Sequence, residues 1–159
     1  MKFSGFRAGL LALTILAPLA AHADGGPFTG YQGSWSGGGS IVTSSGTERI
    51  RCRASYAVDG SGVSLRQNMT CASDSYKFQV VSDIVASGSQ LSGSWSELTH
   101  NASGTVSGSA SPGHFRAFVS GGGFSAGFTV ESTLSRQSVT ITPRGTDVTR
   151  VSVVLQKGG

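Results

Sequence analysis

Charged residues are scarce in this sequence. Asp, Glu, Lys and Arg together make up 13% of the 159 residues, with 12 basic and 8 acidic side chains. A protein that binds nucleic acid usually presents a dense basic surface. Two of the basic residues, Lys2 and Arg7, lie at the extreme N-terminus, and the rest are spread along the chain. We therefore expect no nucleic-acid partner.

Cysteine and histidine, which supply many metal and catalytic sites, are also rare. The chain has two cysteines and three histidines, and no cysteine pair has the spacing of a zinc site. Glu97 and His100 are three residues apart, so on one strand they would point to opposite faces. Residues 123–127 match the G-x-S-x-G nucleophile pattern, but no histidine follows Ser125, and a strand is expected where that motif needs a helix. We expect no metal, no cofactor and no enzymatic activity.

Long apolar runs are absent beyond the N-terminus. A basic start precedes the apolar residues 8–20, which are too few for an ordinary membrane-spanning helix. Residues 21–23, Ala-His-Ala, form a small-x-small cleavage site. This pattern predicts a secretory signal peptide over 1–23, cleaved after Ala23; an uncleaved anchor is the alternative. We expect a periplasmic or secreted protein with no membrane span in its mature form.

Helical periodicity is missing after residue 23, and short alternating runs take its place. The 24 glycines stand mostly at turns between these runs. This pattern predicts an all-β fold, a single antiparallel meander of about 8–10 short strands closed as a barrel or packed as a sandwich. We expect a flexible leader over 24–30 and one domain over 31–157. The predicted strands cover residues 31–43, 48–58, 63–71, 76–85, 90–99, 103–109, 114–120, 124–130, 137–142 and 148–156.

The segment 48–71 holds both cysteines and the clearest alternation. If Ser61 and Gly62 are the central turn residues, opposed positions sum to 123, which places Cys52 directly opposite Cys71. Opposed residues of an antiparallel pair have Cβ atoms near disulfide distance. We predict a disulfide, which also requires an oxidising compartment; two reduced core cysteines are the alternative. The same register would place Arg49 opposite Asp74.

Basic residues occupy the other face of this predicted hairpin. Arg49, Arg51 and Arg53 alternate with the apolar positions, and Arg66 is expected to join them from the second strand. Such a ridge suits phosphate or carboxylate groups, so an anionic envelope component is a candidate partner. The alternative is a solvated strand face that keeps the protein soluble.

The tetrapeptide Gly-Ser-Trp-Ser occurs twice, at 33–36 and 93–96. It indicates either a duplicated half-barrel or shared strand-start chemistry, in which glycine lets the backbone bend beside an indole. In a closed barrel, aromatic side chains would be divided between the core and a cavity for a small apolar ligand. The candidates for such a cavity are Trp35, Trp95, Tyr56, Phe78 and Phe128.

Two resemblances rest on these motifs. The Gly-x-Trp at 33–35 resembles the first strand of calycin barrels, the lipocalin and avidin group, in which that tryptophan plugs or lines the barrel. The wider run of GSWSGGGSI, ERIRCRASYAV, CASDSYKF, GSWSE, GFSAG and PRGTDVT is similar to a family of small exported bacterial proteins. The second resemblance implies an exported all-β domain and no particular activity.

These observations favour an exported, non-enzymatic protein that binds a ligand through an interior pocket or through its arginines. The ligand would be an anionic envelope component or a small apolar molecule. The alternative is a module directed at another protein, such as an inhibitor of an exported protease or an envelope assembly factor. A contiguous exposed apolar patch would favour that alternative.

Overall fold

The computed structural model describes residues 25–158, which form ten strands and no helix. The predicted signal peptide and the predicted mature N-terminus at Asp24 lie outside the described residues. All ten predicted strands are confirmed, with ends that shift by a few residues. The strands are β1 (Gly33–Thr43), β2 (Gly46–Val58), β3 (Ser64–Ala72), β4 (Lys77–Ser87), β5 (Gln90–Glu97), β6 (Ala102–Ser111), β7 (His114–Gly121), β8 (Phe124–Ser132), β9 (Arg136–Arg144) and β10 (Val148–Lys157).

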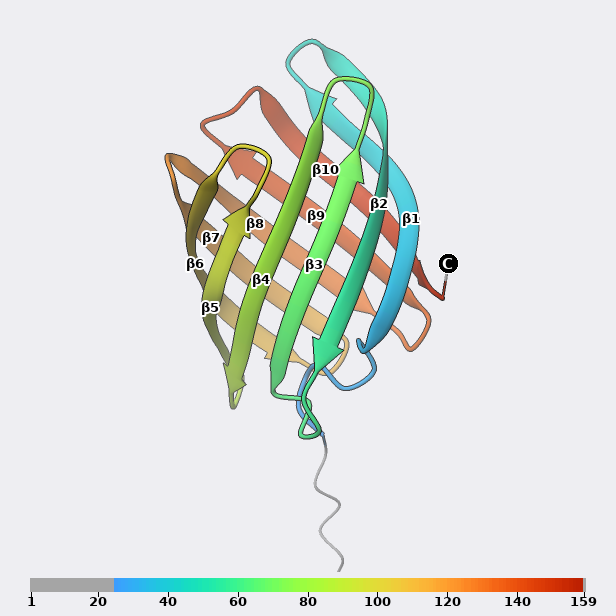
Figure 1. Cartoon of the computed structure of the whole chain (residues 1–159), viewed down its shortest axis with the longest axis vertical. Coiled ribbons are helices and arrows are strands. Elements are labelled where there is room, and N and C mark those ends of the chain that lie inside the picture. Colours follow the sequence, from blue (N-terminus) through green and yellow to red (C-terminus); the bar gives the residue numbers. More distant parts are fainter. Residues whose placement is uncertain (1–24, 159) are drawn as a thin grey trace, which may run out of the picture.

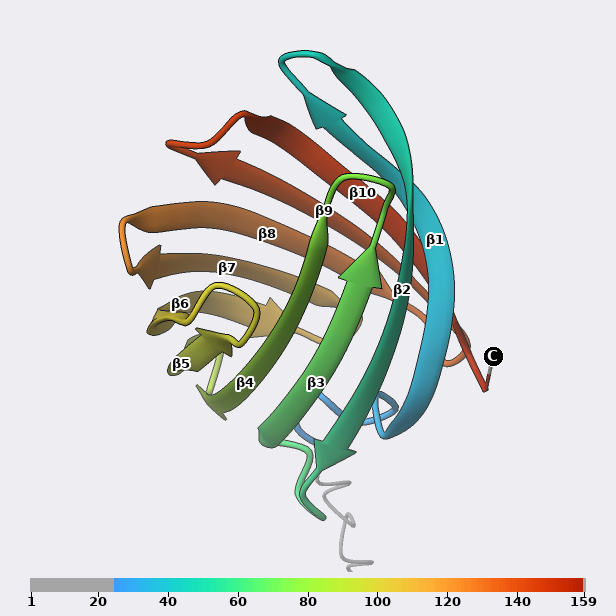
Figure 2. The ribbon, with the colours of Figure 1, turned by 45° about the horizontal axis from the view of Figure 1, so that its top comes forward.

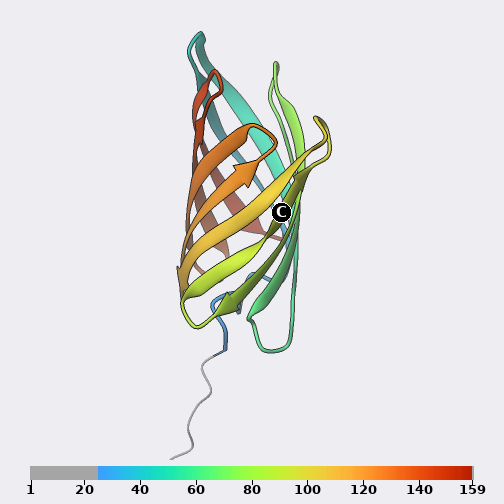
Figure 3. The same ribbon diagram turned by 90° about the vertical axis from the view of Figure 1, so that its left-hand side faces the viewer.

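The strands form one closed antiparallel barrel (Figure 1). Each strand pairs with its neighbours in sequence, and β1 closes the barrel by pairing with β10. The side view shows the tilted strands surrounding one interior (Figure 3). Of the two predicted architectures, the barrel is therefore the one that forms, and closure leaves no sheet edge among the ten strands.

The barrel has two ends, which we name by their position in Figure 1. The upper end carries the turns between β1 and β2, β3 and β4, β5 and β6, β7 and β8, and β9 and β10. The lower end carries the other four turns and residues 25–32. The two ends differ because only the lower end carries the segment that precedes β1.

The predicted hairpin register is confirmed. Cys52 pairs with Cys71 and Val58 with Leu65 in the β2–β3 ladder, and the two cysteines form a disulfide inside the barrel wall. Because disulfides persist in oxidising compartments, the bond indicates an exported protein. The ladder begins at the Arg51–Ala72 pair, so the predicted opposition of Arg49 and Asp74 is wrong: β3 ends before it reaches Asp74.

The lower end is closed by the segment that precedes β1. Phe28 is 1% exposed and its ring packs on Phe115, while Tyr31 packs on Tyr56. The Phe28 amide donates to the Gly62 carbonyl at 3.0 Å. Residues 25–30, for which a flexible leader was predicted, thus pack against the lower end; we call residues 25–32 the plug. The glycine and proline content of residues 24–29 suggested a loose arm; in the structure the Phe28 and Tyr31 rings of this segment and its continuation are buried.

The repeated Gly-Ser-Trp-Ser does not mark two equivalent half-barrels. The copies lie on β1 and β5, four strands apart, whereas duplication of a five-strand half would relate β1 to β6. Their glycines also differ. Gly33 begins β1 with φ of 114°, while Gly93 lies inside β5, where a Cβ atom would approach the Asp83 carbonyl oxygen at 2.1 Å. Glycine is therefore required for a positive φ angle in the first copy and for close approach of a neighbouring strand in the second.

Candidate functional site

Arg49, Arg51 and Arg53 project from the outer face of β2. Strict alternation explains this, because the two intervening side chains, Ile50 and Cys52, are buried while all three arginines are exposed. Successive arginines on one face are about 7 Å apart along the strand. We call these three residues the arginine row.

The arginine row lies between strands with small outward side chains. On β1, Ser40, Gly38 and Ser36 stand directly beside Arg49, Arg51 and Arg53. On β3, Ala72 and Thr70 stand beside Arg51 and Arg53. Within residues 25–158, none of the three arginines forms an ion pair. The three guanidinium groups are therefore flanked by small residues, and no carboxylate of the described residues occupies their N–H donors.

Arg66 does not belong to the arginine row. Its guanidinium makes a two-pronged contact with Asp83 of β4, at 2.6 Å from Nε to Oδ1 and 3.2 Å from Nη2 to Oδ2. Arg66 lies opposite Ala57, four residues beyond Arg53, which corresponds to about 13 Å along β2. It shares the outer face with the row, as predicted, but its charge is matched by a neighbour on the next strand.

Trp35 and Tyr56 lie in the closed lower end. The indole N–H of Trp35 donates to the Tyr31 carbonyl at 2.7 Å, and the Tyr56 hydroxyl donates to Oε1 of Gln137 at 3.0 Å. Their rings are in edge contact at 6.3 Å. Burial raises the pKa of the Tyr56 hydroxyl, with a further contribution from Tyr31. Both candidate ligand-binding residues thus serve the core that anchors the plug.

Trp95 belongs to the same buried core as Trp35 but lies on β5, nearer the upper end. Its ring contacts Phe124 at 5.8 Å between centroids, and it is 6% exposed. Its indole N–H has no hydrogen-bond acceptor among the described residues. Both tryptophans are part of one buried core, and the surface hollows of about 300 and 360 Å³ near the lower end are lined by neither of them.

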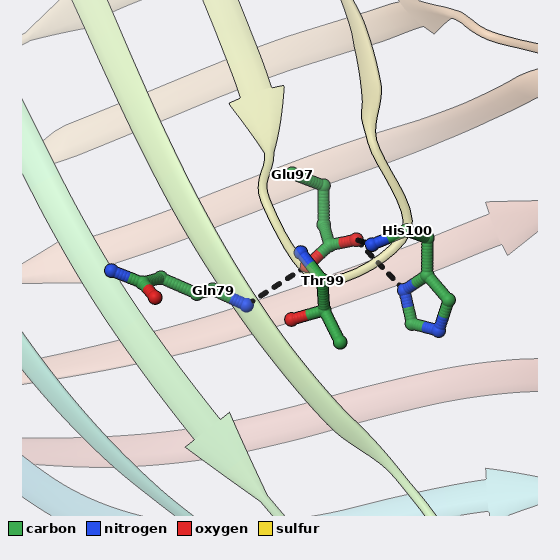
Figure 4. A network of polar contacts seen from close by, with 4 residues as sticks. All are labelled: Gln79, Glu97, Thr99 and His100. Carbon is green, nitrogen blue, oxygen red and sulfur yellow. Dashed lines mark hydrogen bonds and ion pairs between the residues drawn. The ribbon is translucent and has the colours of Figure 1, made fainter.

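Glu97 is the most heavily bonded carboxylate of the upper end (Figure 4). One oxygen accepts from the amides of Gln79 and Thr99, both at 2.9 Å. The other accepts from the amide and Nδ1 of His100, both at 2.7 Å. Burial alone would raise the pKa of Glu97, but these bonds outweigh it and lower the pKa to about 2.

The expectation that Glu97 and His100 point to opposite faces is wrong. His100 lies in the turn after β5, not on the strand, and Asn101 adopts φ of 54° there. The turn brings the imidazole back to the carboxylate. Sequence reasoning missed this structural role, for which the only signal was an acidic residue just before a polar turn. The described residues contain no group of three metal-ligating side chains.

Ser125, the central residue of the G-x-S-x-G pattern, is the second residue of β8. Gly122 and Gly123 form the turn before it with positive φ angles of 59° and 77°, and β8 continues where a nucleophile elbow would have a helix. The structural context of that motif is therefore absent at Ser125, as the sequence indicated.

No protein-family model matches the sequence, and no curated protein matches it either. The ten-stranded barrel is compatible with a calycin-like fold, but neither resemblance is confirmed as a family. Within residues 25–158 there is no helix long and apolar enough to cross a membrane.

Proposed function

We propose that this is an exported, non-enzymatic barrel whose arginine row binds an anionic component of the cell envelope bearing phosphate or carboxylate groups. The proposal rests on one observation: three arginines that are neighbours on the outer face of β2 have no ion-pair partner in the described residues. Guanidinium groups bind such anions through paired N–H donors. Their mutual repulsion, modest at an exposed site, is relieved when an anion lies between them.

The environment of the row supports binding of an extended partner. The neighbouring outward positions on β1 and β3 carry only small residues. A chain of anionic groups could therefore approach the arginines without displacing larger side chains. The spacing of about 7 Å along one strand suits a repeating anion better than a single compact ion.

The row is also held by a rigid support. The side chain of Cys52 lies between Arg51 and Arg53 in sequence but on the opposite face, where its disulfide joins β2 to β3. On the other side, β2 pairs with β1 along eleven residue positions. A strand held on both sides loses little backbone freedom on binding, which favours affinity.

The outer surface supports a mature form without a membrane span. A membrane-spanning barrel turns an apolar band outward. Here the outward positions of β5 and β6 are mainly hydroxyl residues, including Ser92, Ser94, Ser107 and Ser109. The exposed large apolar residues lie on two strands (Val85 on β4, Phe118 on β7) and in two turns (Leu98, Leu134). This scatter does not favour the alternative of a protein-directed module.

The test compares two triple variants of equal charge. Arg49, Arg51 and Arg53 are changed to Gln in one, and Arg116, Arg136 and Arg144, which are exposed on β7 and β9, in the other. The probes are polyphosphate and polygalacturonate, measured by calorimetry at 20, 100 and 300 mM NaCl, concentrations about which exposed charges become strongly screened.

We expect the wild type and the control variant to bind at low salt and to lose affinity as salt rises. The arginine-row variant should bind roughly ten- to hundredfold more weakly, if each exposed pair contributes roughly 0.5 to 1 kcal/mol. Equal losses in the two variants would show that only net charge matters. Normal binding by the arginine-row variant, or its unfolding, would refute the proposal. The two probes separate phosphate from carboxylate as the preferred group.

A further inference from the structure

The arginine row repeats a cation at every second residue of one extended strand. Two residues of extended backbone span six covalent bonds and about 7 Å. In polyphosphate, neighbouring phosphorus atoms are joined through a single oxygen, so its charges are packed much more densely than the arginines. Where a three-carbon polyol links successive phosphates, the phosphorus atoms are six bonds apart, and the extended repeat is again about 7 Å. Such a chain can present one phosphate to each arginine.

A fourth cation lies on one side of the row. Arg51 pairs with Ala72 of β3, and Ala72 pairs with Lys77 of β4. All three residues are exposed on the outer face, and β2, β3 and β4 lie side by side on one wall of the barrel (Figure 2). Two strand spacings, about 10 Å, separate the Cα atoms of Arg51 and Lys77. Two side chains of this length can therefore both reach a phosphate that lies over Ala72.

In the described part of the chain, the opposite side of the row offers no cation in line with it. The strand beyond β1 is β10, where the residues in line with the three arginines are Gln156, Val154 and Ser152. The outward positions of β1 beside the row are half-buried, whereas Thr70 and Ala72 of β3 are exposed. Thr70 stands beside Arg53, and its hydroxyl can donate to a phosphate or bond to a polyol. An anionic chain therefore finds more partners over β3 than over β1.

The surroundings of the row also limit the length and the kind of chain. Asp74, in the turn that follows β3, is exposed just beyond Ala72, so a longer polyanion would meet a like charge there. Single-stranded nucleic acid has the same six-bond phosphate repeat, but proteins hold it by stacking its bases on aromatic side chains. The outward neighbours of the row are Ser36, Gly38, Ser40, Thr70 and Ala72, none of them aromatic. A short polyol phosphate without bases fits this surface better.

From this arrangement we propose that the arginine row binds a chain of phosphates joined by a three-carbon polyol, which lies over β3 with one phosphate held between Arg51 and Lys77. This ligand class rests on the proposed function, because the same three arginines bind it. Lys77 joins them as the residue that selects the side on which the chain lies. Each phosphodiester carries one negative charge, so three of them match three guanidinium groups through charge-assisted hydrogen bonds.

The test compares three probes in NMR titrations of the ¹⁵N-labelled, disulfide-bonded mature protein at pH 7 and 20 mM NaCl, where screening is weak. They are a glycerol phosphate oligomer with three phosphodiesters, inorganic tripolyphosphate, and a thymidine oligonucleotide with three phosphodiesters. Tripolyphosphate carries more charge on a shorter chain, so it would bind most tightly if charge density alone governed affinity. We expect the reverse, with the glycerol phosphate oligomer binding about tenfold more tightly than either of the other probes. Its addition should shift the amide signals of Arg51 and Ala72 and leave those of β10 in place.

Two single variants separate the two sides of the row. Lys77→Gln should weaken binding of the oligomer roughly two- to fivefold, the effect of losing one exposed ion pair. Arg150→Gln is the matched control, because Arg150 is exposed on β10, beyond the opposite side of the row. It should bind the oligomer like the wild type.

The outcomes distinguish this inference from the proposed function. If no probe binds, or if the arginine-row variant binds every probe like the wild type, the proposed function fails and the inference fails with it. Tighter binding of tripolyphosphate would show that the row binds anions by charge alone. Equal losses in Lys77→Gln and Arg150→Gln would remove the chain from β3, and tighter binding of the oligonucleotide would make nucleic acid the preferred ligand. Any of these last three results would overturn the inference while the arginine row remained an anion-binding site.

Discussion

Replacing Glu97 by Gln should loosen the turn between β5 and β6 in a way that depends on pH. The amide oxygen of the new side chain can still accept from Gln79 and Thr99, which share one carboxylate oxygen. The amide nitrogen would then face the backbone N–H and Nδ1 of His100, which share the other oxygen. The backbone N–H of His100 loses its acceptor and faces a donor instead, and the imidazole can accept from the amide only in the tautomer in which Nδ1 carries no proton.

The size of the effect follows from the pKa of Glu97, which falls from its ordinary value of 4.5 to about 2 in the folded protein. At 1.36 kcal/mol per unit of pKa shift, the ionised carboxylate stabilises the folded state by at most about 3 kcal/mol. Screening by water at the end of the barrel reduces this to about 1 to 2 kcal/mol. Because the folded pKa is the lower one, the stabilisation is fully present above pH 4.5 and is lost as the pH falls towards 2.

Urea unfolding of the disulfide-bonded mature protein, followed by tryptophan fluorescence, measures this directly at pH 7, 4 and 2.5. The wild type should exceed Glu97→Gln by about 1 to 2 kcal/mol at pH 7, and the difference should shrink as the pH falls. Glu131→Gln, an exposed change on β8, is the control and should stay within about 0.5 kcal/mol of the wild type. A difference between wild type and Glu97→Gln that persists unchanged at pH 2.5 would refute the reasoning.

Two further predictions concern the supports of the barrel. Reduction of the Cys52–Cys71 bond, which closes a sequence separation of 19 residues, should lower the unfolding free energy by about 3 kcal/mol; equal urea midpoints for the reduced and oxidised forms would contradict this. Phe28→Ala should cost about 3 to 5 kcal/mol by leaving a cavity under the plug and should speed amide exchange at Gly26 and Phe28, which bond to the loop of residues 61–62. Exchange rates unchanged from wild type would show that the plug does not depend on this ring.

The local alternation of apolar and polar residues was sufficient to predict much of the fold. Alternation in β2 and β3 predicted which side chains face inward, and a turn centred on Ser61 and Gly62 was enough to align Cys52 with Cys71. These features depend on residues close in sequence, where a strand period of two and a short turn leave few arrangements. The outward direction of the arginines follows from the same alternation.

Other features depended on contacts between distant segments. Pairing of β1 with β10 joins residues more than a hundred positions apart, such as Ile41 and Val151, and only that pairing distinguishes a barrel from a sandwich. The plug is ordered because Phe28 meets Phe115, which no local pattern in 24–30 reveals. Arg66 leaves the arginine row because the β3–β4 register places Asp83 opposite it.

The sequence by itself thus determined the strands, the hairpin register, the disulfide and the outward arginines, since each follows from period-two alternation within one or two neighbouring strands. Only the tertiary structure decided that the barrel closes, that one end is plugged, and that Trp35 has a hydrogen-bond acceptor whereas Trp95 has none. The two tryptophans occupy identical tetrapeptides. Their difference arises from what the closed barrel places around each indole, because burial and hydrogen bonding are properties of the assembled neighbours and not of the local sequence.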